Sequence, residues 1–144
     1  MSKINLKIVT PEKVIYQNDQ VDQVSIPTTT GEITVLPNHV PLVSILQSGE
    51  MVFKENGKDN YFALSGGFLE IKENNEVIVL ADNVERAHEI NVERAEAAKA
   101  KAEEEMKNIK NREDVDFARL QAVIDREANR LRVGNKYRKL PKSE

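Results

Sequence analysis

The basic side chains in the last third of the chain are the residues whose spacing points most directly to chemistry. Arg94 and Lys101 are seven residues apart, and Arg126 and Arg130 are four apart, so each pair shares a face if its segment is helical. If this segment folds back on itself at its middle, residue 94 lies opposite residue 130, and residue 101 lies near residues 123–126. The four cations would then converge on one side and attract a polyanion such as a nucleoside triphosphate.

A simpler interpretation is that each of these cations pairs with a carboxylate close to it in the chain. The carboxylates within reach are Glu93, Glu96, Asp125 and Glu127. Exposed ion pairs of this kind contribute little to stability. Spacing alone favours these ion pairs over the polyanion site.

The remaining titratable residues give no pattern typical of catalysis or of metal binding. His39 and His88 are far apart in the chain, and His39 follows Pro37 and Asn38 in an expected turn, where we expect a structural or interface role. The three glutamates at residues 103–105 are typical of a solvated helix face with lysines nearby. The sequence contains no phosphate-binding loop, dinucleotide-binding glycine motif, zinc-protease motif or nucleophile elbow. We therefore predict no catalytic residue and no metal site.

The composition is that of a soluble chain without a strong overall charge. Charged residues make up 31% of the 144 residues, hydrophobic residues make up 40%, and the formal net charge is −3. This balance argues against disorder, and against attraction to nucleic acid or an anionic membrane. The absence of cysteine excludes a disulfide framework and a thiolate metal site. Because no apolar run matches a signal peptide or a membrane span, we expect a soluble, cytoplasmic protein.

The elements that must position these residues follow from a shift in composition near residue 83. Almost all glycine, proline and phenylalanine residues lie before residue 81, whereas residues 83–110 contain none of them and no tyrosine. We therefore expect two domains, residues 1–83 and residues 84–144.

Alternating β-branched and aromatic runs in the first domain predict about nine short strands. The expected runs are residues 4–8, 14–16, 21–26, 33–36, 40–46, 51–53, 61–64, 68–71 and 77–80. Turn residues separate them, with Asn56-Gly57 as the strongest hairpin signal and Gly66-Gly67 as another expected turn. Because no helix intervenes, we predict an antiparallel β-sandwich whose two sheets cover each other.

Helical periodicity predicts that the second domain is an antiparallel two-helix hairpin, which gives an α+β fold. Small and aliphatic residues recur at helical steps over residues 92–109 and again over residues 117–131. Asp114 or Asp116 is expected to cap the second helix, and Gly134 to end it in a left-handed conformation. The seam of the first helix is largely alanine and buries little area, so we expect a movable element.

Four segments, in the order found in the family, resemble the epsilon subunit of bacterial F-type ATP synthases. They are GEITVLPNHVPL at residues 31–42, SGGFLEI at residues 65–71, INVERA at residues 90–95 and NRLRV at residues 129–133. The resemblance covers residues 3–133. Thr34 replaces the family's usual glycine, which predicts that the backbone there does not need a positive φ.

The resemblance implies a non-catalytic rotor subunit of a proton-translocating ATP synthase, with no required cofactor. In that family the β-sandwich binds the gamma subunit and rests on the c-ring, and the hairpin can extend into the alpha/beta catalytic head and inhibit ATP hydrolysis. Glu32 matches the position that faces the c-ring loops, and His39 is expected in the same lower loop region. The implied location is the cytoplasmic face of the bacterial cell membrane, peripheral and held through the complex.

In some members of this family the folded hairpin also binds regulatory ATP. The matching positions here are Glu85, Asn91, Arg94, Lys101, Arg126 and Arg130. Asn91 replaces the family's Asp and so loses a charge, although it caps a helix equally well. Lys101 stands where ATP-binding members have Arg, and lysine lacks the bidentate fork of arginine. We therefore expect ATP to bind more weakly than in strong binders, or not at all.

Two other functions are distinguishable from a rotor subunit. A free-standing ATP-sensing module would use the hairpin cations alone and form a stable ATP complex without any partner. A small hydrolase is disfavoured by the missing motifs, and turnover by the isolated chain would revive it.

Overall fold

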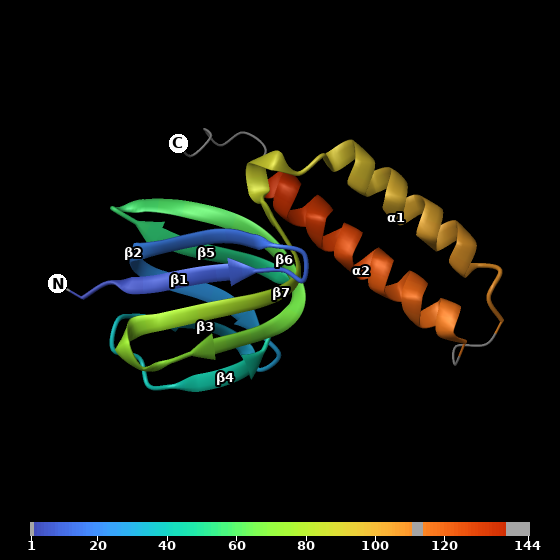
Figure 1. Ribbon diagram of the computed structural model, residues 1–144. Coiled ribbons are helices and arrows are strands. Elements are labelled where there is room, and N and C mark those ends of the chain that lie inside the picture. The colour runs from blue at the N-terminus through green and yellow to red at the C-terminus, as the bar shows by residue number, and fades with distance from the viewer. Residues whose placement is uncertain (1, 111–113, 138–144) are drawn as a thin grey trace. The chain divides into compact units, whose positions relative to one another are not determined.

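The computed structural model describes residues 2–110 and 114–137, which form two compact units (Figure 1). The β-domain ends at Arg86 and the helical domain begins at Ala87. Strand pairing continues past residue 83, because Phe62 still lies opposite Arg86 at the end of the last strand.

The β-domain has seven strands that close on themselves. They are β1 (Ile4–Val9), β2 (Val14–Thr28), β3 (Gly31–Val35), β4 (Leu42–Ile45), β5 (Gly49–Glu55), β6 (Lys58–Ile71) and β7 (Glu76–Arg86). The long β2 pairs with β1 through its first half and with β5 and β3 through its second, so the circuit β1–β7–β6–β5–β2 returns to β1. The predicted β-sandwich is thereby confirmed. One pair, β1 with β7, is parallel, and the other strand pairs are antiparallel.

The prediction of about nine strands was wrong, because two pairs of expected strands are continuous. The expected runs at residues 14–16 and 21–26 both lie in β2, and those at 61–64 and 68–71 both lie in β6. Gly66 and Gly67 are therefore not a turn but a kink inside β6, where φ is +69° and +110°. A Cβ on Gly67 would lie 1.9 Å from the Leu80 carbonyl oxygen, so glycine lets β6 bend while it stays against β7.

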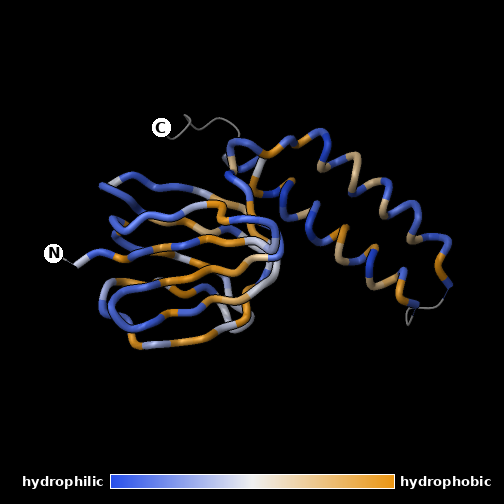
Figure 2. Tube along the Cα trace, viewed as in Figure 1, coloured by the Kyte–Doolittle hydropathy of each residue, from blue (hydrophilic) through white to orange (hydrophobic). Residues whose placement is uncertain are grey.

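The core of the β-domain lies between the two layers and follows the alternation of the strands. Along β1, Ile4, Leu6 and Ile8 are buried while the intervening residues are half-exposed. Figure 2 shows this alternation of apolar and polar residues along the strands. The rings of Phe53 and Phe62 are fully buried with their centroids 5.4 Å apart. Burying each ring stabilises the fold by roughly 1.5–3 kcal/mol, so these two strands are held firmly in register.

Asparagine supplies the left-handed backbone of several turns in this domain. Asn56 and Gly57 have φ of 51° and 79° and form the two-residue turn between β5 and β6, which confirms the predicted hairpin. Asn74 and Asn75 also have positive φ, in the short 3₁₀ turn Glu73–Asn75 between β6 and β7. Thr34 lies within β3 without a positive φ, as expected from its replacement of glycine.

The helical domain is an antiparallel hairpin, as predicted. It begins with a 3₁₀ turn (Ala87–Glu89), followed by α1 (Val92–Met106) and α2 (Val115–Lys136). Asn91 caps α1, because its Oδ1 accepts a hydrogen bond of 2.9 Å from the backbone N–H of Arg94. Asp114 caps α2 in the same way. Residues 111–113 of the expected break between the helices lie outside the described residues.

The expectation for Gly134 was wrong, because this residue lies inside α2 and does not end it. A Cβ at Gly134 would approach the Cγ2 atoms of Val92 and Ile90 to 2.9 and 3.0 Å, so glycine permits close packing at this end of the hairpin. The buried residues of α1 are Val92, Ala95 and Ala102, which confirms the narrow alanine-rich seam.

Candidate functional site

An exposed apolar row crosses five neighbouring strands on the outer face of the β-domain. It consists of Val14, Val9, Leu80, Phe68 and Ile45, each directly opposite the next in the strand pairing; Val9 is half-buried and the other four are exposed. Paired residues project from the same face of a sheet, and five strands span about 19 Å. Phe68 and Ile45 are 53% and 54% exposed, although residues of this type are normally buried. The strand pairing therefore brings together a contiguous apolar patch, which is typical of a protein-binding surface.

Charged groups and a shallow groove border the apolar row. Two residues further along each strand, the same face carries the charged Glu70 and Lys7 together with Val43 and Ile78. A groove of about 450 Å³ lies beside them, with Val43 and Glu70 in its lining. An apolar centre with a charged rim is the usual composition of a protein interface. The sequence showed these residues as strand members, but only the register of pairing shows that they are contiguous.

Glu32 and His39, predicted together in one lower loop region, lie at opposite ends of β3. Glu32 is exposed beside the turn between β2 and β3, whereas His39 lies in the loop that follows β3. The loop holding His39 is tied to the turn between β6 and β7, because the backbone N–H of Asn38 donates to Asn75 Oδ1 at 2.5 Å. Glu32 and His39 are therefore separated along β3, which rises about 3.3 Å per residue.

The structure separates the six positions matched to ATP binding into two groups. Glu85 lies on β7 in the β-domain, opposite Ala63, and the other five lie in the helical domain. In the hairpin, Val92 lies against Gly134. Because both helices rise by about 1.5 Å per residue, Arg94 is level with about residue 132, and Lys101 with about residue 125.

Arg126 and Arg130 share one acidic partner on α2. Glu127 accepts from Arg126 Nε at 2.9 Å through one carboxylate oxygen, and from Arg130 Nη1 at 2.6 Å through the other. Only 3% of Glu127 is exposed, so this charge pairing is stronger than that of a solvated surface pair. The ion-pair interpretation of the sequence therefore holds for these two arginines, with Glu127 as their common partner.

The cations of α1 differ from those of α2. Arg94 and Lys101 are exposed, and within the described part of the chain no carboxylate lies within ion-pairing distance of either side chain. Asn91 uses its side-chain oxygen to cap the helix, which leaves its amide hydrogens as donors. The hairpin therefore offers two cations to an external anion and holds two others in an internal ion pair.

A second polar cluster lies at the end of β7, where the β-domain gives way to the hairpin. Tyr16 donates to Glu55 Oε2 at 2.7 Å and accepts from Asn18, and the Arg86 guanidinium lies 5.7 Å from its ring centroid. Arg86 also lies 5.1 Å from the ring of Phe62. Burial, and then the hydrogen bond to Glu55, raises the pKa of Tyr16 to about 12. A phenol that is so hard to deprotonate is no nucleophile, and this cluster instead anchors the end of β7.

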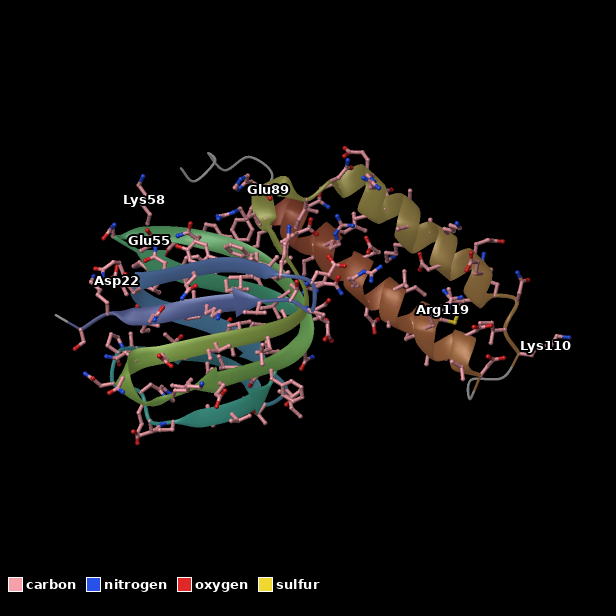
Figure 3. The ribbon with its side chains drawn as sticks, viewed as in Figure 1. Asp22, Glu55, Lys58, Glu89, Lys110 and Arg119 are labelled. Carbon is pink, nitrogen blue, oxygen red and sulfur yellow. The ribbon has the colours of Figure 1, made fainter. Side chains whose placement is uncertain are left out.

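The turn between β5 and β6 in the β-domain carries a third cluster of charges. Glu55 and Lys58 flank this turn, and Asp22 lies near them at the same edge of the domain (Figure 3). Asp22 is paired with Lys3, and that hydrogen bond lowers the pKa of the Asp22 carboxyl more than partial desolvation raises it. The pair joins β2 to the residue just before β1, so it is a structural link.

The described residues contain neither a metal-binding cluster nor a membrane-spanning helix. No three His, Asp or Glu side chains among residues 2–110 and 114–137 are placed to hold a metal ion. Within the same residues, neither helix is long and apolar enough to cross a bilayer.

Comparison with known families gives two adjacent matches that together span most of the chain. The model of the β-sandwich domain of the ATP synthase delta/epsilon chain matches residues 3–87, and the model of its long α-helix domain matches residues 88–135. The chain is 45% identical over 130 residues to the ATP synthase epsilon chain of Nitratidesulfovibrio vulgaris (strain DP4), covering 90% of this chain and 94% of that one. It is 39% identical over 133 residues to the epsilon chain of Staphylococcus aureus (strain JH9), covering 92% and 97%.

Solved structures share the fold at low sequence identity. A chain in the Euglena gracilis mitochondrial ATP synthase, solved with OSCP, F1 and the c-ring, matches with a TM-score of 0.75 and 20% identity, covering 90% of this chain and 79% of that one. A chain in the central stalk and c-ring of the Tetrahymena thermophila mitochondrial ATP synthase matches with a TM-score of 0.64 and 14% identity, covering 96% and 98%.

Proposed function

The chain belongs to the delta/epsilon chain family of ATP synthase, and on this basis we propose that it is a non-catalytic subunit of the central stalk. In this proposal the β-domain couples the gamma subunit to the c-ring of a proton-translocating enzyme. The hairpin is the regulatory part, which inhibits ATP hydrolysis when it extends toward the alpha/beta head. The subunit lies at the cytoplasmic face of the bacterial cell membrane, held there by the complex.

The apolar row is the observation that carries the docking role. The exposed residues Phe68, Leu80 and Ile45 of this row are of types that a soluble chain normally buries. The charged groups at its border can fix the orientation of a bound partner. We assign this row, with the loop of His39, to gamma. Glu32, exposed at the other end of β3, is assigned to the c-ring. Two separate contacts fit a subunit that must join two partners.

The hairpin has the physical character of a movable element. Its first helix buries only one valine and two alanines along its length, so its packing contributes little free energy. Much of its outer surface is charged, so it can stay in contact with water in both the folded and the extended form. A partner that binds the extended form more tightly can therefore shift the equilibrium by a few kcal/mol.

Regulatory ATP would bind to the folded hairpin through its cations and the cap of α1. Arg94 and Lys101 are exposed and have no carboxylate within ion-pairing distance among the described residues, so they are available to phosphate. Lys101 offers phosphate a single ammonium where Arg would offer a bidentate fork, and Asn91 lacks the charged acceptor that Asp would offer to a hydroxyl or amino group of the nucleotide, so this site is weaker than one built from Asp and Arg. We expect ATP to occupy this site only at high ATP concentrations.

Binding to purified gamma tests the docking role. Phe68→Glu should abolish co-elution of the chain with gamma on size-exclusion chromatography, because it places a charge within the apolar row, between Leu80 and Ile45. Val115→Glu makes the same change at an exposed valine of α2 and should leave co-elution intact. Equal binding by both variants would show that the row is not the gamma interface.

A further inference from the structure

Among the described residues of α2, Glu127 is the only carboxylate that accepts hydrogen bonds from two arginines. Each of its two oxygens accepts from a different guanidinium, Arg126 Nε at 2.9 Å and Arg130 Nη1 at 2.6 Å. The side chain is 4% exposed, whereas those of Arg126 and Arg130 are 39% and 24% exposed. The arginines thus reach solvent, and the carboxylate between them does not.

This arrangement presents to each arginine the same chemistry that a phosphate would present. Carboxylate and phosphate oxygens both accept charge-assisted hydrogen bonds from the guanidinium edge. The Nε edge of Arg126 is already used by Glu127. A polyphosphate that approaches these arginines must take over donors that Glu127 holds, or bind beside a fixed negative charge, and like charges in contact oppose binding.

We propose that Glu127 is an internal counterion that competes with polyphosphate for Arg126 and Arg130 and so sets a low affinity of the hairpin for ATP. The proposal rests on the proposed regulatory binding of ATP. It adds that the weakness has a third cause besides Asn91 and Lys101, and one that a single substitution removes. In the absence of nucleotide the same carboxylate relieves the repulsion between the two arginines.

The alternative role for Glu127 is to position the arginines for phosphate. Each guanidinium has five donors, and Glu127 uses one of those of Arg126 and one of those of Arg130 in the contacts above. A positioning carboxylate would raise affinity, whereas a competing one lowers it. The two roles therefore predict opposite signs for the same substitution.

The test is isothermal titration of the full chain with ATP and, separately, with inorganic tripolyphosphate. Glu127→Gln keeps the side-chain shape and removes the charge, and should raise the affinity for both ligands by about tenfold or more. Glu127→Asp keeps the charge and should stay close to the unmodified chain. Glu96→Gln, at an exposed position on the face of α1 opposite Arg94 and Lys101, removes the same charge away from the site and should change the affinity less than about twofold. Circular dichroism at 222 nm confirms that each variant retains its helices.

The outcomes separate this inference from the ATP proposal. Tighter binding by Glu127→Gln supports the inference, and if the unmodified chain shows no binding it also overturns regulation of the native chain by ATP. Binding by the unmodified chain with equal or weaker binding by Glu127→Gln overturns the inference and leaves ATP regulation intact. A gain for ATP without a gain for tripolyphosphate also overturns competition at the phosphates. No binding by either chain overturns both.

Discussion

At the scale of single residues, the role of a titratable side chain in this protein depends on the groups that surround it. Tyr16 lies between the Glu55 carboxylate and the Arg86 guanidinium and keeps its proton as a hydrogen-bond donor, whereas Glu127 lies between two arginines and is their counterion. The sequence placed Glu127 among the partners of the hairpin cations, because it lies next to Arg126 and three residues before Arg130. It could not show the Tyr16 cluster, because Glu55 and Arg86 come from strands far away in the chain and meet Tyr16 only after pairing.

The raised pKa of Tyr16 predicts a loss of stability at alkaline pH. The folded pKa is about 12, whereas an unfolded tyrosine titrates near 10. Below pH ~10 both states keep the proton and the contribution is constant. Between about pH 10 and 12 the unfolded chain loses a proton that the folded chain retains, so the free energy of unfolding falls as pH rises.

Urea unfolding of the unmodified chain and of Tyr16→Phe, followed across pH 9.5–12, measures this contribution. The stability of the unmodified chain should fall more steeply with pH than that of Tyr16→Phe. Parallel pH dependences for the two chains would show that Tyr16 has the same pKa in the folded and unfolded states.

At the scale of elements, the two wrong predictions both concern glycine. Strand and helix patterns predicted the sandwich and the hairpin, because alternation and 3.6-residue periodicity depend on burial that both folds require. Gly66-Gly67 and Gly134 carry the same local signal as a turn and a helix end, but the first pair permits a kink at positive φ inside β6, and Gly134 permits close packing inside α2. A local signal cannot distinguish a glycine that the backbone needs from one that a neighbour needs.

Gly134→Ala tests the packing role of this glycine at the end of the hairpin. Alanine favours a helix interior by about 1 kcal/mol, but the new Cβ would press on two stiff β-branched side chains at a cost of about 1–3 kcal/mol. In the native background we expect a net destabilisation of the hairpin by about 1 kcal/mol, measured by thermal unfolding at 222 nm. In a Val92→Ala background, where one contact is removed, the same substitution should be less costly. The same cost in both backgrounds would contradict the packing explanation.

At the scale of the whole molecule, the division of the chain is the feature that the function requires. The composition shift near residue 83 indicated a boundary, and the structure divides after Arg86, where pairing with Phe62 ends. The family motifs pointed to rotor and regulatory roles, while the apolar row became visible only through strand register. The row joins residues from five strands, and no window of sequence contains it.

Hydrolysis of ATP by the assembled complex tests the central claim most directly, that the β-domain docks and the hairpin restrains. The assay compares complexes containing the full chain with complexes containing a chain that ends at Arg86, matched for the amount of bound subunit. We predict that the shortened chain remains bound and that ATP hydrolysis rises. Retention of the shortened chain with unchanged hydrolysis would contradict the regulatory role of the hairpin, and loss of the shortened chain would contradict docking by the β-domain alone.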